Sequence, residues 1–267
     1  MNQKIAFIGA GSMGGAIVRG FVKSGAVNPE LLYVCDHHQE NLDALKQDCK
    51  ADISCFIDAE EMLSHNVDMV ILAVKPQVMP EVIVKHRQAL AGKLVISIAA
   101  GITVEVLETL MPESKVVRVM PNLPITQLSG ACAICAGPSS SCEDIALVET
   151  LFSALGVASV MNEAQLDIEA AVVGCAPAYF ALFIDALTRA AIKAGMPAAV
   201  SRNMLLSTMA GTAKTLLESG EHPRSYMDQV TSPGGTTAEA LYEMEPLIMQ
   251  AGFLGIEAAL KRTEELS

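Results

Sequence analysis

Short apolar runs alternate with amphipathic stretches over residues 1–161. Strands are predicted at residues 4–8, 31–35, 53–57, 69–74, 94–98, 116–120, 131–135 and 157–161. Between the early runs, apolar positions recur at helical spacing over residues 12–24 and 41–49. Repeated strand–helix units of this kind predict right-handed βαβ connections and a mostly parallel sheet.

The pattern changes after residue 161, where strand signals stop. Helices are predicted over residues 163–194, from Pro197 to about Ser219, from near Thr236, and from about residue 251 to the end. The sequence therefore predicts an α/β domain at residues 1–161 and an all-α domain at residues 162–267.

The helical domain is unusually apolar for a chain that stands alone. No lysine occurs between Lys115 and Lys193, and many helix faces carry only Ala, Leu, Met and Val. Faces of this kind are normally covered by another subunit, which predicts a homodimer. Burial within one chain is the alternative.

Composition excludes several classes of function. The formal net charge is −12, aromatic residues make up 4% and tryptophan is absent, which argues against nucleic-acid binding and against an anionic membrane surface. The uncharged stretch between Glu169 and Asp185 is shorter than the roughly 20 residues that span a bilayer. Seven cysteines and no apparent leader predict reduced thiols and a cytoplasmic protein.

The strongest local motif follows the first predicted strand and opens the first predicted helix. It consists of Gly9, Ala10, Gly11, Ser12, Met13 and Gly14. In a G-x-G-x-x-G at this position, the first glycine permits the turn, the second admits a pyrophosphate and the third lets the helix pack on the strand. This predicts a dinucleotide site at a helix N-terminus, with a plain glycine-rich turn as the alternative.

Further candidate cofactor residues follow later strands. Asp36 comes after the second strand, where a carboxylate can bind the ribose hydroxyls of NAD and would repel the 2′-phosphate of NADP. His37 or His38 could donate to that phosphate, so the residues leave the choice of cofactor open. At three more strand ends the candidates are Ala73, Val74, Lys75, Pro76, Ala99, Ala100, Gly101 and Asn122. Lys75 and Asn122 could equally serve the backbone of their own loops.

A second motif runs from Asp228 to Leu241 and contains a Ser-Pro-Gly-Gly-Thr-Thr segment. Thr236 can cap the following helix and Glu239 can complete a capping box, so an ordinary helix start is one interpretation. The hydroxyls and free N–H groups that converge there also suit a small carboxylate.

Other polar groups have simpler interpretations. Cys132 and Cys135 lack a second ligand pair, so buried thiols are favoured and no metal site is predicted. Arg118 is the only basic group inside a buried-looking strand. It either pairs with a carboxylate or reaches the cofactor.

Together these segments resemble the pyrroline-5-carboxylate reductase family over essentially the whole chain. The matching segments are GAGSMG, AVKPQ, RVMPNLP, GCAPAYFALFIDAL and DQVTSPGGTTAEAL, of which the last looks like the family signature. Two positions depart from the family pattern. Cys175 stands where serine is frequent, and Asp36 is unexpected because many members prefer NADPH.

The resemblance implies a Rossmann-like N-terminal domain, a C-terminal all-α dimerisation domain, and reduction of a cyclic imine to L-proline, the last step of proline biosynthesis. It implies that the substrate carboxylate is held by Ser232, Gly234, Gly235, Thr236 and Thr237, with the Thr237 hydroxyl as the catalytic group. NADPH is the expected cofactor, NADH the alternative, and a homodimer or higher oligomer the expected assembly.

Two other functions would fit the glycine motif. A β-hydroxyacid dehydrogenase would need a lysine base early in the long helix, where this chain has none. A nucleotide-sensing protein without turnover would not need the segment from Ser232 to Thr237.

Overall fold

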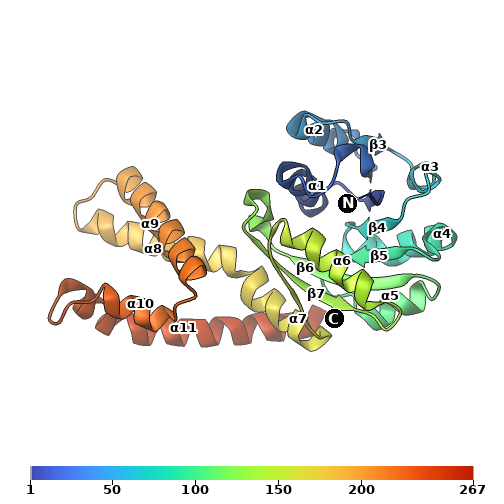
Figure 1. Cartoon of the computed structure of the whole chain (residues 1–267). Coiled ribbons are helices and arrows are strands. Elements are labelled where there is room, and N and C mark those ends of the chain that lie inside the picture. Colours follow the sequence, from blue (N-terminus) through green and yellow to red (C-terminus); the bar gives the residue numbers. More distant parts are fainter. Residues whose placement is uncertain (1, 267) are drawn as a thin grey trace. The chain divides into compact units, whose positions relative to one another are not determined.

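The computed structural model describes residues 2–266 and divides into two compact units (Figure 1). Unit 1 comprises Met1–Cys175 together with Arg262–Ser267, and unit 2 comprises Ala176–Lys261.

Unit 1 is built on an eight-stranded sheet of order β3-β2-β1-β4-β5-β6-β7-β8. The strands are β1 (Ile5–Ile8), β2 (Leu32–Cys35), β3 (Ser54–Phe56), β4 (Met69–Leu72), β5 (Leu94–Ser97), β6 (Lys115–Pro121), β7 (Gly130–Ala136) and β8 (Gly156–Val160). The strands from β1 to β6 run parallel, so the predicted α/β fold class is confirmed. The chain reverses strand order between β1 and β4, where ligands bind in open sheets of this kind.

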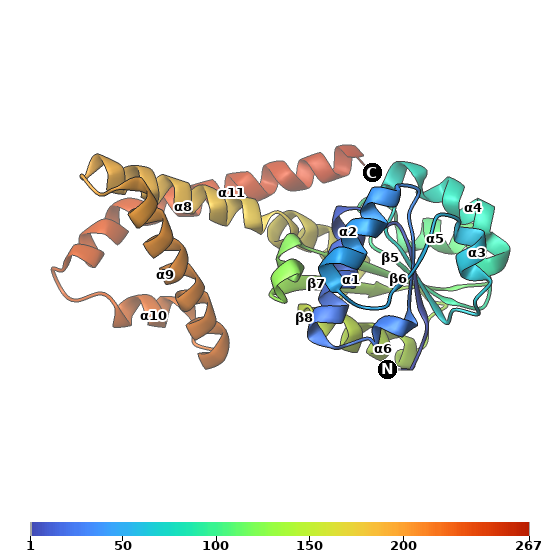
Figure 2. The same ribbon diagram turned by 90° about the horizontal axis from the view of Figure 1, so that it is seen from above.

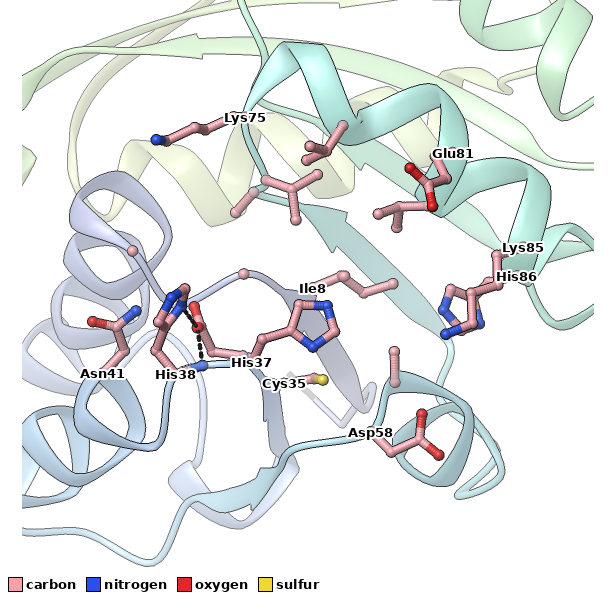
Figure 3. Close-up of a pocket in the computed structure, with 18 residues that line it drawn as sticks. Ile8, Cys35, His37, His38, Asn41, Asp58, Lys75, Glu81, Lys85 and His86 are labelled. Atoms are coloured by element: carbon pink, nitrogen blue, oxygen red, sulfur yellow. Dashed lines mark hydrogen bonds and ion pairs between the residues drawn. The ribbon is translucent and has the colours of Figure 1, made fainter.

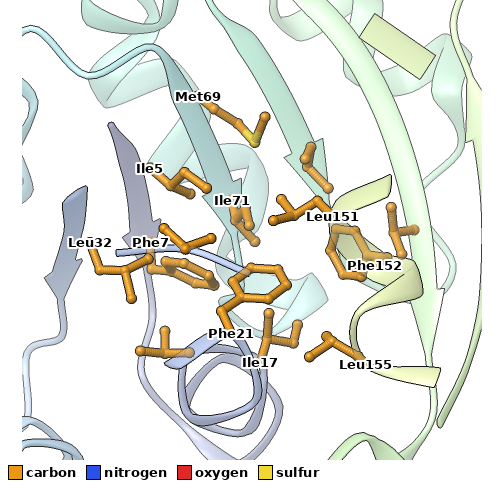
Figure 4. Close-up of a cluster of buried hydrophobic side chains, with 14 of the residues drawn as sticks. Ile5, Phe7, Ile17, Phe21, Leu32, Met69, Ile71, Leu151, Phe152 and Leu155 are labelled. Atoms are coloured by element: carbon orange, nitrogen blue, oxygen red, sulfur yellow. The ribbon is translucent and has the colours of Figure 1, made fainter. Parts of the chain in front are cut away.

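Helices cover both faces of the sheet (Figure 2). One face carries α1 (Ser12–Ser24), α2 (Gln39–Cys49) and α6 (Cys142–Ser153), and the other carries α3 (Ala59–Leu63), α4 (Met79–Leu90) and α5 (Val104–Leu110). In the first layer the rings of Phe7, Phe21 and Phe152 form a continuous contact, with centroid distances of 6.2 and 5.7 Å (Figure 4). This core fixes α1, and with it the loop that precedes α1, against β1.

The last two strands depart from the predicted parallel arrangement. β7 pairs antiparallel with β6, and β8 runs parallel to β7. The connection between β6 and β7 holds only a short 3₁₀ turn, η3 (Leu123–Gln127). A parallel connection needs a crossover of a dozen or more residues, so this short loop returns the chain antiparallel.

The first compact unit extends beyond the domain boundary that the sequence predicts. The sequence places that boundary at residue 162, where strand signals stop. In the structure, unit 1 continues through α7 (Glu163–Glu169) and the π-helical turn η4 (Ala170–Gly174). Leu166 on α7 is fully buried in a cluster with Ala133 and Cys135 of β7. The first helical turns after residue 162 are therefore part of the core of unit 1.

Unit 2 consists of helices only. These are α8 (Ala176–Lys193), α9 (Ala198–Ser219), α10 (Pro223–Gln229) and most of α11 (Thr236–Leu266), and α8 packs against α9. The prediction of separate helices near Thr236 and from residue 251 was wrong, because α11 is continuous. Pro246 lies inside it, and a proline removes one hydrogen bond without necessarily ending a helix.

Candidate functional site

The glycine loop between β1 and α1 has the backbone conformation that its motif predicts. Gly9 has φ +108°, and a Cβ there would lie 2.6 Å from the Ala73 carbonyl oxygen. At Gly14 a Cβ would lie 2.3 Å from the Gly9 carbonyl oxygen, so the close helix–strand packing is confirmed. Gly11 faces open space within 4 Å, which leaves its backbone accessible to a ligand.

The loop ends at the N-terminus of α1, and Gly11 is the N-cap residue. The N–H groups of the first helical turn have no partner within the helix, and the helix dipole gives that end a partial positive charge. No acidic side chain occupies the first turn. Ser12, Met13 and Gly14 therefore begin a helix that presents an anion-binding end.

A cavity of about 530 Å³ opens beside this loop (Figure 3). The predicted cofactor residues that line it are Gly9, Gly11, Asp36, His37, Ala73, Val74 and Lys75. Their elements are separate in sequence and meet at the carboxyl ends of β1, β2 and β4. The cavity and the open face of Gly11 fit a dinucleotide, since backbone can approach a pyrophosphate there.

The wall of the cavity formed by α4 was not predicted from the sequence. Figure 3 shows Glu81, Lys85 and His86 there, at the opposite end from His38 and Asn41. His86 is buried, and burial followed by the neighbouring charge of Lys85 lowers its pKa. No motif marks these α4 positions, because they reach the cavity only through the packing of α4 on the sheet.

Asp36 is hydrogen-bonded to the glycine loop. Its Oδ2 accepts a hydrogen bond from the Ala10 N–H at 2.7 Å, and its Oδ1 accepts one from the His38 N–H at 2.8 Å. Partial burial favours the neutral acid, but these bonds outweigh it and lower the pKa of Asp36. The cavity wall therefore carries a fixed negative charge.

The predicted cofactor residues at the carboxyl ends of β5 and β6 are not among the residues that line this cavity. Ala99, Ala100 and Gly101 follow β5, and Gly101 has φ +76°. Asn122 follows β6, and its side chain accepts a bond from the Ala131 N–H at 2.8 Å and donates one to the Val173 carbonyl at 3.2 Å. These bonds favour the structural interpretation of Asn122, which ties β7 and η4 together.

Arg118 on β6 is buried and pairs with a carboxylate. Its guanidinium donates to Glu163 of α7, and Asp167 lies 3.8 Å away. The same Glu163 oxygen accepts a bond from the Val104 N–H at the start of α5. The pairing interpretation of Arg118 is thereby confirmed, and its function is to join β6, α5 and α7.

The two cysteines of β7 behave as core residues. Cys132 and Cys135 are buried, and burial raises the pKa of both thiols, that of Cys132 to about 12. Over residues 2–266, no cluster of three or more His, Cys, Asp or Glu side chains is arranged to hold a metal ion.

The Ser232–Thr237 segment lies in unit 2 and forms a tight turn followed by α11. The Gly235 N–H donates to the Ser232 carbonyl at 2.9 Å, and Gly234 has φ +68°, as a type II turn with Pro233 requires. The Gly235 carbonyl accepts the first helical bond, from Glu239, so Gly235 is the N-cap and the prediction of Thr236 there was off by one residue. Thr236 and Thr237 occupy the first turn of α11.

Two family models match the chain. Residues 4–101 match "NADP oxidoreductase coenzyme F420-dependent", and residues 163–266 match "Pyrroline-5-carboxylate reductase dimerisation". The model matches agree with the two predicted folds, Rossmann-like before helical.

Whole-chain comparisons agree with these models. A pyrroline-5-carboxylate reductase of Methanosarcina acetivorans is 35% identical over 99% of this chain and 98% of its own. Among solved structures, a pyrroline-5-carboxylate reductase of Coxiella burnetii has a TM-score of 0.93 at 31% identity, covering 100% of this chain and 99% of its own. A Plasmodium falciparum pyrroline carboxylate reductase with NADP bound has a TM-score of 0.86 at 30% identity, covering 99% of this chain and 98% of its own. The chain belongs to the pyrroline-5-carboxylate reductase family.

Proposed function

We propose that this protein reduces 1-pyrroline-5-carboxylate to L-proline, with NADPH as hydride donor and NADH as the alternative. The observation that carries the proposal is the full-length similarity to pyrroline-5-carboxylate reductases, with both the glycine loop and the Ser-Pro-Gly-Gly-Thr-Thr turn present. This is an oxidoreductase reaction at a C=N bond and the last step of proline biosynthesis.

Residues of unit 1 would hold the cofactor, which supplies the hydride for the imine carbon. The N–H groups at the start of α1 would bind the pyrophosphate, and the open side of Gly11 lets the backbone approach it. Asp36 and His37 face the cavity from the end of β2, and Lys75 faces it from the loop after β4.

Residues of unit 2 would hold the substrate carboxylate. The first N–H groups of α11 have no helical partners, and the Ser232 hydroxyl lies in the same turn. A Cβ at Gly235 would lie 2.3 Å from the Ser232 Oγ, so glycine there keeps the hydroxyl beside the helix end. An anion in this position is favoured by the dipole of a long helix.

The remaining chemical task is to stabilise the negative charge that develops on the imine nitrogen as hydride adds to the imine carbon. A Thr237 hydroxyl can donate a hydrogen bond there, but threonine is a poor acid. The proton therefore comes through a water relay or with a substrate already protonated in solution. Positioning and electrostatic stabilisation are sufficient for such a reaction, without a nucleophile or a covalent intermediate.

The test follows the absorbance of reduced nicotinamide with pyrroline-5-carboxylate and each cofactor in turn. Thr237→Ala should lower kcat/KM about tenfold to a hundredfold and leave NADPH binding unchanged. Thr215→Ala is a matched control, because its exposed hydroxyl donates to the Gly211 carbonyl within α9. Absence of turnover with both cofactors would overturn the enzyme function, and an unchanged kcat/KM in Thr237→Ala would exclude Thr237.

The assembly proposed is a homodimer or higher oligomer formed through unit 2. Among the residues of unit 2, only Ile184, Thr188 and Ser201 are buried, whereas Leu217 and Phe253 are 76% and 72% exposed. A groove of about 400 Å³ between α8 and α9 is lined almost entirely by apolar side chains. A helical unit with so little core of its own is stabilised by a second copy.

Covering by a second copy also accounts for an apolar helical segment of membrane-spanning length. Among residues 2–266, the segment Glu163–Lys193, which comprises α7, η4 and α8, is long and apolar enough to cross a bilayer, but it falls within the match to the dimerisation model. We place the protein in the cytoplasm, without nucleic-acid or membrane partners. Sedimentation should give at least a dimer, and Phe253→Asp should shift it toward monomer. Val84→Asp, at an exposed apolar position of α4, is the control.

A further inference from the structure

The groups proposed to hold the substrate carboxylate come from two different helices. The Thr231 hydroxyl donates to the Met227 carbonyl of α10 at 2.6 Å, so Ser232 follows directly from the end of that helix. The N–H groups proposed to bind the same carboxylate belong to the first turn of α11. The distance between the Ser232 hydroxyl and these N–H groups therefore depends on the direction of α10 relative to α11.

The turn between the two helices fixes that direction only weakly. A single backbone hydrogen bond closes it, from the Gly235 N–H to the Ser232 carbonyl at 2.9 Å. Gly234 and Gly235 have the least restricted backbone torsions of any residue type. Ser232 and Gly234 are also exposed, so packing adds little. A contact outside the turn is needed to hold α10 in place.

An ion pair at the far end of α10 supplies such a contact. The chain reverses direction at the turn, so α10 and α11 form a hairpin (Figure 1). The guanidinium of Arg224, near the start of α10, donates to both carboxylate oxygens of Glu245 in the third turn of α11, at 2.9 and 2.6 Å. Among the side chains that the structure describes, this is the ion pair that joins the two helices.

The geometry of the pair suits a positioning function. A bidentate pair fixes the relative orientation of its partners as well as their distance. Asp228, one turn further along α10, also attracts the guanidinium, but both of these hydrogen bonds go to Glu245. Exposed pairs add little to the free energy of unfolding. In a binding site, by contrast, a displacement of about 1 Å can change the rate by about a hundredfold.

We propose that the Arg224–Glu245 pair positions the substrate-binding turn. By fixing α10 against α11, it keeps the Ser232 hydroxyl and the first N–H groups of α11 close enough together to bind one carboxylate. Both members of the pair are positioning residues, because they act through the turn. The inference rests on the proposed function, since it assumes that this turn binds the carboxylate of pyrroline-5-carboxylate.

The experiment measures kcat and KM for pyrroline-5-carboxylate at saturating NADPH, and the dissociation constant of NADPH, in Arg224→Met and Glu245→Gln. The substrate carboxylate is bound equally in the ground state and the transition state, so a misplaced turn raises KM without lowering kcat. Each variant should raise KM about threefold to tenfold and leave kcat and NADPH affinity within about twofold.

Two comparisons separate positioning from other effects. A long-range electrostatic effect on the anionic substrate would change KM in opposite directions, because Arg224→Met removes a positive charge and Glu245→Gln a negative one. The double variant should be no worse than either single variant, since each breaks the same pair. Arg189→Met is the matched control, because it breaks an exposed pair with Asp185 inside α8 and should leave KM unchanged.

Four results would overturn the inference. These are a KM unchanged in both variants, opposite changes of KM in the two, effects that multiply in the double variant, or a loss of kcat and NADPH affinity that accompanies the rise in KM. The last would indicate a general disturbance of the fold. Absence of turnover by the unaltered protein would instead overturn the proposed function, so the two failures are distinguishable.

Discussion

A glutamate at the end of α7 makes the stability of unit 1 depend on pH. One carboxyl oxygen of Glu169 is buried and has no hydrogen-bond partner within residues 2–266. Burial raises the pKa of Glu169 from 4.5 to about 7. The residue precedes η4, whose Val173 carbonyl is held by Asn122. Replacing Glu169 by glutamine should therefore stabilise the protein in the pH range where the carboxylate is charged.

The sign and size of this effect follow from proton linkage. Between pH 4.5 and 7 the folded protein retains a proton that the unfolded chain has lost, so stability falls as pH rises. A pKa raised from 4.5 to about 7 corresponds to at most about 3 kcal/mol. Because the group is only half-buried, solvent screening reduces this to about 1–2 kcal/mol. The destabilisation by the buried Glu169 carboxylate is complete above about pH 7 and absent below pH 4.5.

The assay is urea unfolding followed by far-UV circular dichroism, since the chain contains no tryptophan. The free energy of unfolding of Glu169→Gln minus that of the unaltered protein should increase by about 1–2 kcal/mol from pH 5 to pH 8. Glu113→Gln, at an exposed position before β6, is the control and should show no such increase. A difference for Glu169→Gln that does not change with pH would refute the reasoning.

Two further predictions concern the glycine loop and the buried arginine. Gly11→Ala, whose added Cβ meets open space, should leave the unfolding free energy within about 0.5 kcal/mol and weaken NADPH binding at least about tenfold, measured by nicotinamide fluorescence. An unchanged affinity would show that the cofactor backbone does not approach this residue. Arg118→Met should cost about 2–4 kcal/mol in urea unfolding, because Glu163 loses its buried partner. A loss below about 1 kcal/mol would contradict the structural function of the pair.

The sequence predicted the elements whose signals are local. The glycine turn and the strand runs identified the Rossmann-like half, because a turn with positive φ and a buried parallel strand each leave a mark in a few residues. The reversal at β7 was missed, since it depends on the length of the loop after Pro121. The last two predicted helices are one continuous helix, α11, because Pro246 inside it does not end it.

The cavity was likewise predicted only where its residues belong to a local motif. Gly9, Gly11 and Asp36 were predicted because each stands at a fixed place in a known motif. Lys85 and His86 reach the cavity from the side of α4, and nothing in their local sequence indicates that position. A wall that is created by packing one helix on a sheet becomes visible only in three dimensions.

The hydrogen bond from the Ala10 N–H to Asp36 links the glycine loop to the carboxylate at the end of β2. The same carboxylate that faces the cavity also fixes an N–H of the glycine loop, so its removal would disturb pyrophosphate binding and ribose recognition together. A substitution that leaves no hydrogen-bond acceptor at this position would therefore weaken the binding of both NADPH and NADH, and it would hide any change in the preference between them. A clean test of cofactor choice at residue 36 therefore removes the charge and keeps an oxygen beside the Ala10 N–H, as Asp36→Asn does.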